Sequence, residues 1–205
     1  MKPEYWDKAR RSLIKADPTM ARIIRAHPKV FMMRRGEAFM TLARAICGQQ
    51  ISVKAAQSVW NRVCECVGEI TPQNVLSRKR PQLRACGLSE RKTEYIADLA
   101  QHFADGKIHE RSWPQMDDEA IIAELTDVRG IGRWTAEMFL MFNLLRPDVF
   151  PLGDLGLQKG IRVNYFKGRK ISLGRMRKLG ENWRPWRSVA TWYLWRSLDP
   201  LPVEY

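Results

Sequence analysis

Apolar residues recur along most of this chain at the three- and four-residue spacing of an α-helix. Between residues 37 and 50 they fall at Phe39, Leu42, Ala43 and Ile46, and the stretch 52–68 repeats the pattern at Val53, Ala56, Val59, Trp60 and Val63. The sequence has no sustained two-residue alternation and no Asn-Gly or Asp-Gly hairpin between β-branched runs. The pattern predicts an all-α protein of about eight to ten short helices.

Residues that start and stop helices support this interpretation. Ser89 is suited to cap a helix that ends near Gly106, and Asp117 is suited to cap the next one, through Leu125. Further helices are expected at 133–145, from 154 onward, and at 175–183 and 186–198, the last two being separated by Pro185.

The chain shows no low-complexity linker and no internal repeat. We expect two helical lobes: a middle lobe at roughly 30–130, and a second lobe made from 1–29 plus 131–205. A helix-hairpin-helix motif is expected at about 117–145. A cleft between the lobes would be a usual place for a ligand.

The charge balance is unusual. The 205 residues include 35 Lys and Arg against 22 Asp and Glu, a formal charge of +13. Basic residues crowd both ends, as in "KARRSLIK" and "RVNYFKGRKISLGRMRKLG", whereas acidic residues gather in "MDDEAIIAEL". This asymmetry predicts a basic face and favours a nucleic-acid partner over a membrane surface or a general solubility charge.

Several classes of protein are disfavoured. Cys47, Cys64, Cys66 and Cys86 lack the spacing of a zinc site, and we expect them to be reduced cysteines in helical cores. No run of 18 apolar residues and no signal peptide is found. We expect a cytoplasmic protein (in the bacterial nucleoid) or a nuclear one in a eukaryote, not secreted, and a monomer because no coiled-coil pattern appears.

The stretch "LTDVRGIGRWTAEMF" carries the first candidate chemistry. Gly130 and Gly132 would leave backbone N–H groups uncovered at the start of a helix, where a phosphate can bind. A tight connection between two helices would look the same. A dinucleotide-binding turn is excluded, because no strand precedes it and the third glycine is missing.

The second candidate is Asp154, which follows Pro151 and Gly153 in "DVFPLGDLGLQKG". The aspartate is suited to cap the next helix, and that role alone would explain it. A carboxylate held at a helix N-terminus and facing a cleft could also stabilise a cationic sugar.

Together with "WRPWRSVATWYLWR", these runs resemble the helix-hairpin-helix/Gly-Pro-Asp DNA glycosylases, and are most similar to the alkylation-repair branch, DNA-3-methyladenine glycosylase II. "ARAICGQQISVKAA" and "LRACGLSERKTEYIADLA" extend the resemblance to about residues 12–198. Many members carry an amino-terminal β domain, for which we expect no room here. The four-cysteine iron-sulfur cluster of some members has no counterpart.

The resemblance implies a role for each matching residue. Asp154 would be the catalytic aspartate, and no catalytic metal is expected. DNA-binding positions would be Gln50, Gly130, Ile131, Gly132, Arg133 and Thr135. The backbone carbonyls of Thr126, Val128 and Ile131 would hold a structural Na⁺ or K⁺.

The remaining implied positions concern the damaged base. Gln50 would fill the gap left by the flipped base, although an ordinary loop amide is equally compatible with its residue type. Trp134, Met138 and Trp195 would line the base pocket, with Met138 standing where some relatives have tyrosine. Trp134 occupies the position at which strand-cutting members place a nucleophilic lysine. Core packing is the alternative for Trp134 and our expectation for the tryptophans at 60 and 192.

The resemblance therefore implies a monofunctional base-excision repair glycosylase that flips alkylated purines, 3-methyladenine or 7-methylguanine, out of double-stranded DNA and hydrolyses the N-glycosidic bond. Two alternatives remain open at this point. The same scaffold could act on hypoxanthine, uracil or an oxidised purine, or the protein could bind distorted DNA without catalysis.

Overall fold

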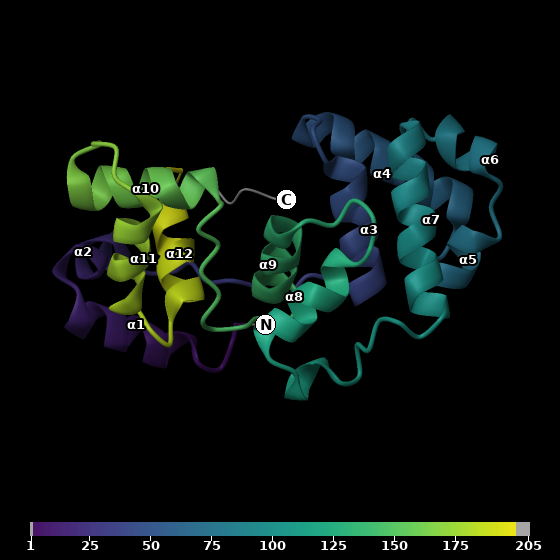
Figure 1. The fold of residues 1–205 in the computed structure, drawn as a ribbon. Coiled ribbons are helices and arrows are strands. Elements are labelled where there is room, and N and C mark those ends of the chain that lie inside the picture. Colours follow the sequence, from purple (N-terminus) through teal and green to yellow (C-terminus); the bar gives the residue numbers. More distant parts are fainter. Residues whose placement is uncertain (1, 200–205) are drawn as a thin grey trace. The chain divides into compact units, whose positions relative to one another are not determined.

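The computed structural model describes residues 2–199, and the regular structure in that range is entirely helical (Figure 1). The all-α prediction is therefore confirmed. The described α-helices are α1 Trp6–Ala16, α2 Pro18–Ala26, α3 Ala38–Gly48, α4 Val53–Val67, α5 Pro72–Leu76, α6 Arg80–Ala85, α7 Glu90–Ala104, α8 Asp118–Thr126, α9 Arg133–Phe142, α10 Leu155–Phe166, α11 Leu173–Glu181 and α12 Arg187–Arg196, and Trp113–Gln115 forms the 3-10 helix η1.

The described residues thus form more helices than the eight to ten expected. The helices α5 and α6 have only five and six residues. Each is shorter than two helical turns, so an apolar repeat cannot be recognised in it. Both carry a proline in the first turn, which starts a helix without leaving a periodic signal.

The chain divides into two compact units. Within the described range, unit 1 comprises residues 2–34 and 140–199, and unit 2 comprises Arg35–Phe139. Unit 1 contains α1, α2, α10, α11 and α12, whereas unit 2 contains α3 to α8 and η1. The helix α9 starts in unit 2, and its last three residues are counted with unit 1.

Unit 1 is organised around α12, which packs against α1, α2 and α10 (Figure 1). Every residue from Ser188 to Arg196 is buried. Gly160 brings α10 close to α12, because a Cβ at this position would lie 3.1 Å from the Cβ of Leu194. Asp17 adds a buried polar centre, whose Oδ2 accepts hydrogen bonds from Tyr165 at 2.7 Å and from the Trp183 indole at 3.0 Å. The amino-terminal helices α1 and α2 therefore share one core with α10 and α12.

Unit 2 is organised around α3 and α7, with α4 against α3 and with α5 and α6 against α7. Edge-to-face ring pairs mark its core, Phe39 with Phe103 at 5.3 Å and Trp113 with Phe139 at 5.2 Å. Trp60 is 6% exposed in unit 2 and Trp192 is 8% exposed in unit 1, which confirms core packing for these two tryptophans.

The predicted helix caps are found as well. The Ser89 hydroxyl accepts from the Lys92 N–H at 3.3 Å, and Asp117 accepts from the Ala120 N–H at 2.8 Å. Gly106 follows the end of α7 with φ at +68°, the left-handed conformation for which glycine is suited. Over the described residues, the helices are too short or too polar to span a membrane.

Candidate functional site

Asp154 is held by the first turn of α10. Its backbone N–H donates to Pro151 at 2.8 Å, which closes the turn before the helix, and its Oδ1 accepts from the Leu157 N–H at 2.6 Å. The predicted N-cap is thereby confirmed. The side chain is 8% exposed, so it is fixed in one place and nearly shielded from solvent.

A second donor binds the same carboxylate oxygen. The indole Nε1 of Trp195, on α12, donates to Asp154 Oδ1 at 2.8 Å. Gly156 makes room for this contact, because a Cβ there would lie 3.1 Å from both that oxygen and the indole nitrogen. The sequence predicts Trp195 as a wall of the base pocket, but gives no sign of its bond to the aspartate.

Aromatic packing fixes the Trp195 ring. Phe142, at the end of α9, stacks on it with centroids 6.0 Å apart and an interplanar angle of 19°. Trp192 meets the same phenyl ring edge-on at 5.9 Å. The donor to Asp154 is therefore part of a rigid aromatic cluster within unit 1.

In unit 2, the glycine hairpin connects α8 to α9. Gly130 adopts φ of +83°, and a Cβ there would lie 2.2 Å from the nearest ring atom of Tyr95 on α7, so only glycine fits. Nothing lies within 4 Å of a Cβ built on Gly132. Val128 and Ile131 are buried beneath the turn. The second glycine therefore presents an uncovered backbone.

Two side chains outside the hairpin form hydrogen bonds with its backbone. The Gln49 amide, at the end of α3, donates to the Gly130 carbonyl at 2.8 Å. Asp98, on α7, accepts from the Arg129 N–H at 2.8 Å. Sequence reasoning missed both, because these partners lie 81 and 31 positions from the hairpin residues they bind and no local pattern links them.

The start of α9 combines a paired cation with a half-exposed indole. The Arg133 guanidinium binds Glu119 at 2.8 Å and Glu137 at 3.1 Å, and the Glu119 hydrogen bond raises the arginine pKa further above its usual value. Trp134 is 40% exposed, so its indole is not fully buried in the core. Thr135 is partly exposed.

The other predicted residues differ in their exposure. Met138 is 8% exposed, farther along α9. Gln50 is exposed in the loop between α3 and α4 and has φ of +58°, a conformation that non-glycine residues rarely adopt. Ile51 and Val53, beside it, expose 41% and 66% of their surface. The exposed glutamine with positive φ is therefore followed by two exposed apolar side chains, Ile51 in the loop and Val53 at the start of α4.

The carbonyls predicted to hold a cation lie in the hairpin. That of Val128 accepts from the Ile131 N–H at 3.1 Å. Within the described part of the chain, no donor is recorded for the Thr126 and Ile131 carbonyls. Backbone carbonyl oxygens of this kind are ligands that monovalent cations use in proteins. The cation itself stays a prediction.

The cysteines are free thiols in unit 2, and the expected core position holds for Cys47 and Cys86, whereas Cys64 and Cys66 are only partly buried. Burial raises the pKa of Cys47 to about 12 and that of Cys86 to about 11, so both stay protonated near neutral pH. Across the residues described, no group of three or more His, Cys, Asp or Glu side chains is arranged to bind a metal.

A family model described as "HhH-GPD superfamily base excision DNA repair protein" matches residues 43–185, well over half of the chain. The chain belongs to the HhH-GPD superfamily. The match includes the hairpin and Asp154 but stops before Trp195. The glycine hairpin and Asp154 therefore both lie in the part of the chain that defines its membership of the superfamily.

Curated relatives agree with the HhH-GPD assignment. The DNA-3-methyladenine glycosylase 1 of Schizosaccharomyces pombe is 34% identical over 169 residues, which cover 80% of this chain and 74% of that protein. The YfjP protein of Bacillus subtilis is 30% identical over 88% of this chain. The matched part spans 66% of the YfjP length, slightly under two thirds.

Solved structures agree on the HhH-GPD fold. The DNA-3-methyladenine glycosidase of Bacillus halodurans has a TM-score of 0.87 and 32% identity, covering 92% of this chain and 88% of that one. The 3-methyladenine DNA glycosylase (Mag1) of Schizosaccharomyces pombe, in complex with abasic DNA, has a TM-score of 0.80 and 30% identity, covering 97% and 99%.

Proposed function

We propose that this HhH-GPD chain is a monofunctional DNA glycosylase that releases alkylated purines from double-stranded DNA by hydrolysing the N-glycosidic bond. The observation that carries the proposal is Asp154, a shielded carboxylate fixed by the Leu157 N–H and the Trp195 indole. The names of the relatives, as DNA-3-methyladenine glycosylases, support the substrate class.

In the proposed reaction, the bond between the base nitrogen and the sugar C1′ breaks, and its electron pair leaves with the base. The sugar becomes an oxocarbenium-like cation, which a nearby carboxylate stabilises electrostatically. Water then attacks C1′ and loses a proton, which Asp154 can accept. The two donors on Oδ1 fix the carboxylate in position before the charge develops, so little reorganisation is needed in the reaction.

The proposed selectivity follows from the charge of the substrate. Alkylated purines such as 3-methyladenine and 7-methylguanine carry a positive charge and are good leaving groups. An indole face favours a cation over its neutral parent by about 1 kcal/mol or more when desolvated. Trp134 presents a half-exposed indole that is suited to this role. It also lacks the nucleophilic amine that a strand-cutting mechanism requires.

DNA would be held through its backbone at the hairpin. Gly132 leaves the start of α9 uncovered, and a helix N-terminus binds a phosphate through its N–H groups. A Na⁺ or K⁺ on the Thr126, Val128 and Ile131 carbonyls would add a positive charge beside that phosphate. We propose that Gln50 fills the space of the flipped base and that the protein acts as a monomer.

Base release from methylated duplex DNA, measured by chromatography, tests the proposal. Asp154→Asn should lower the single-turnover rate of 3-methyladenine or 7-methylguanine release by about 10²- to 10⁴-fold while DNA binding is kept. Asp117→Asn is the matched control, because Asp117 caps α8 in the same way and should leave the rate unchanged. A rate for Asp154→Asn within about threefold of wild type would reject the mechanism.

A lesion panel separates the alternatives. Duplexes carrying hypoxanthine, uracil or 8-oxoguanine should release little base compared with methylated DNA. Faster release from one of these would keep the mechanism and change the substrate. If no lesion yields free base while distorted DNA is bound tightly, the protein is a non-catalytic binder.

A further inference from the structure

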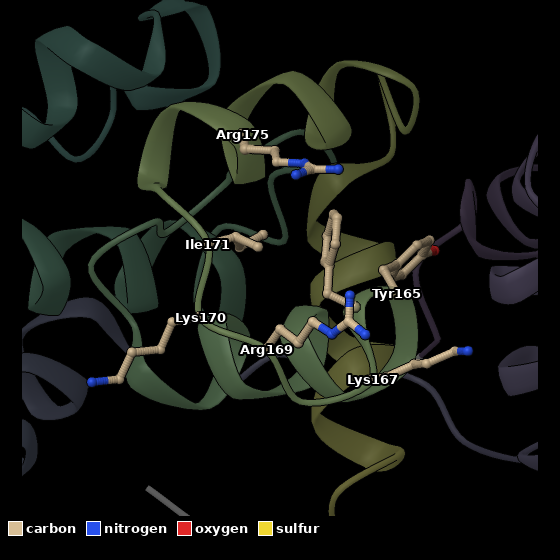
Figure 2. Close-up of a pocket in the computed structure, with 7 residues that line it drawn as sticks. Tyr165, Lys167, Arg169, Lys170, Ile171 and Arg175 are labelled. Atoms are coloured by element: carbon tan, nitrogen blue, oxygen red, sulfur yellow. The ribbon is translucent and has the colours of Figure 1, made fainter.

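A basic pocket of about 300 Å³ lies in unit 1, where α10 ends and α11 begins (Figure 2). The residues that line it carry four cations and no carboxylate. They are Tyr165, Phe166, Lys167, Arg169, Lys170, Ile171 and Arg175. This pocket is separate in sequence from the hairpin, and neither Asp154 nor Trp195 lines it.

The loop that carries three of these cations is ordered by its own hydrogen bonds. Lys167 and Gly168 both adopt positive φ, and the Gly168 N–H donates to the Arg162 carbonyl at 2.8 Å. The Arg169 N–H donates to Phe166 at 3.0 Å. The chain therefore turns sharply at the end of α10, and the charged side chains leave from a fixed backbone.

The four cations are not neutralised by the protein. In the described part of the chain, no ion pair is recorded for Lys167, Arg169, Lys170 or Arg175. Other arginines of the chain are paired: Arg133 with Glu119, and Arg187 with Asp148. A cluster of unpaired like charges is self-repulsive, so an external anion would relieve it.

One guanidinium is positioned by an aromatic ring. Arg175 lies over the Phe166 ring, 4.9 Å from its centroid, which orients the side chain without cancelling its charge. Arg175 also lies in the first turn of α11, whose N-terminus Ser172 caps. The positive end of that helix adds to the field around the pocket.

We propose that this basic pocket binds phosphates of the DNA backbone, as a contact additional to the glycine hairpin. The inference rests on the proposed function only in taking duplex DNA as the polyanion. In Figure 2, Lys167 and Lys170 extend to opposite sides of the loop, Arg169 lies between them, and Arg175 lies across the pocket on α11. Such a spread suits successive phosphates along a strand better than a single compact anion.

The salt dependence of binding to undamaged duplex DNA tests this inference. Each phosphate contact that is lost should reduce the slope of log K against log[salt] by about 0.9. The variant Lys167→Gln/Arg169→Gln/Lys170→Gln should therefore bind more weakly, with a slope that is smaller by about 1.8 to 2.7 for two or three contacts. Arg169→Gln alone should lower it by about 0.9.

The matched control is Arg25→Gln/Lys29→Gln/Arg34→Gln, which lies outside the two basic runs of the sequence. It removes the same charge from exposed positions of the same unit, and these side chains do not line the pocket. Its slope should equal that of wild type, and circular dichroism should show both triple variants folded. Equal slopes for the two triple variants would overturn the proposal, because the loss would then reflect net charge alone.

Inorganic phosphate separates the two sources of the same chemistry. Calorimetry with inorganic phosphate is carried out on the wild-type protein and on Lys167→Gln/Arg169→Gln/Lys170→Gln. If the triple variant loses phosphate binding but keeps the wild-type salt slope for DNA binding, the pocket is a free-anion site and the proposal fails. Because undamaged DNA is used, this outcome is independent of catalysis. Failure of the proposed function would instead appear as wild-type protein that releases no base.

Discussion

The N-termini of helices α9 and α10 differ in whether a side chain caps them. The N-terminus of α10 is closed by its own residue, Asp154, whose Oδ1 accepts from the Leu157 N–H. The N-terminus of α9 follows Gly132, which has no side chain with which to cap the helix and no neighbour within 4 Å of the place a Cβ would take. Both helices lie within the residues that the HhH-GPD family model matches, yet α10 is capped by the Asp154 carboxylate, whereas α9 is preceded by a glycine.

The difference separates two proposed tasks. The carboxylate at α10 is fixed by groups that touch it directly, which suits a residue that must be in place when a cation forms. The hairpin before α9 must leave its backbone N–H groups accessible to a phosphate. Its conformation is therefore restrained by contacts with residues outside the hairpin, namely Gln49, Tyr95 and Asp98. Changes at α10 should therefore alter the rate of base release, and changes at α9 should alter DNA affinity.

Making the two N-termini alike should have the largest effect on DNA affinity. Gly132→Asp gives α9 a carboxylate cap, and the open space and non-positive φ at this position accommodate the side chain. Because a like charge placed against a phosphate costs several kcal/mol, we expect DNA affinity to fall by about 100-fold or more. The melting temperature should be unchanged or slightly raised, since aspartate is a good cap. Fluorescence anisotropy and a thermal melt measure the two effects.

Gly132→Asn is the control for that swap. It provides a similar cap without the charge, so its loss of affinity should be clearly smaller than that of Gly132→Asp. Equal losses for the two variants would mean that bulk rather than charge is excluded from the turn. Unchanged affinity in both would remove the hairpin from the proposed DNA contact.

Trp195→Phe should produce an intermediate effect, on the rate alone. It deletes the Nε1 donor to Asp154 while keeping a ring against Phe142. A hydrogen bond to a charged group contributes about 1.5–3 kcal/mol, so single-turnover base release should slow by about tenfold or more with DNA affinity nearly unchanged. Trp192→Phe is matched, since its indole packs against the same phenylalanine but has no hydrogen-bond partner among residues 2–199. Similar slowing in both variants would assign the effect to packing.

The sequence predicts those parts of this arrangement that are encoded locally. A cap needs one polar residue at the start of an apolar repeat, so Ser89, Asp117 and Asp154 could be recognised in advance. The glycine pair could be recognised for the same reason. Helices α5 and α6 could not, because five or six residues cannot display a helical repeat.

Long-range contacts are the part that sequence reasoning misses. Arg133 is predicted to contact DNA, and the pairing of its guanidinium with Glu119, fourteen positions earlier and in another helix, has no signal in the local sequence. Gly156 is a second example, because its function depends on the Trp195 indole, which approaches from α12. Pairings of this kind depend on how helices pack, and a single sequence records no signal for them.

The smallest expected effect tests whether the hairpin needs its hydrogen bond from Gln49. Gln49→Ala removes the amide that donates to the Gly130 carbonyl at 2.8 Å. A typical hydrogen bond contributes about 0.5–1.5 kcal/mol, so DNA affinity should fall by about threefold, with base release at saturating enzyme unchanged. Gln101→Ala is the control, because it removes an amide hydrogen bond to Asp105 at 2.6 Å, at the far end of α7. If the two variants bind DNA equally well, the hairpin keeps its shape without the Gln49 hydrogen bond. In that case DNA binding at the hairpin does not depend on this contact from outside it.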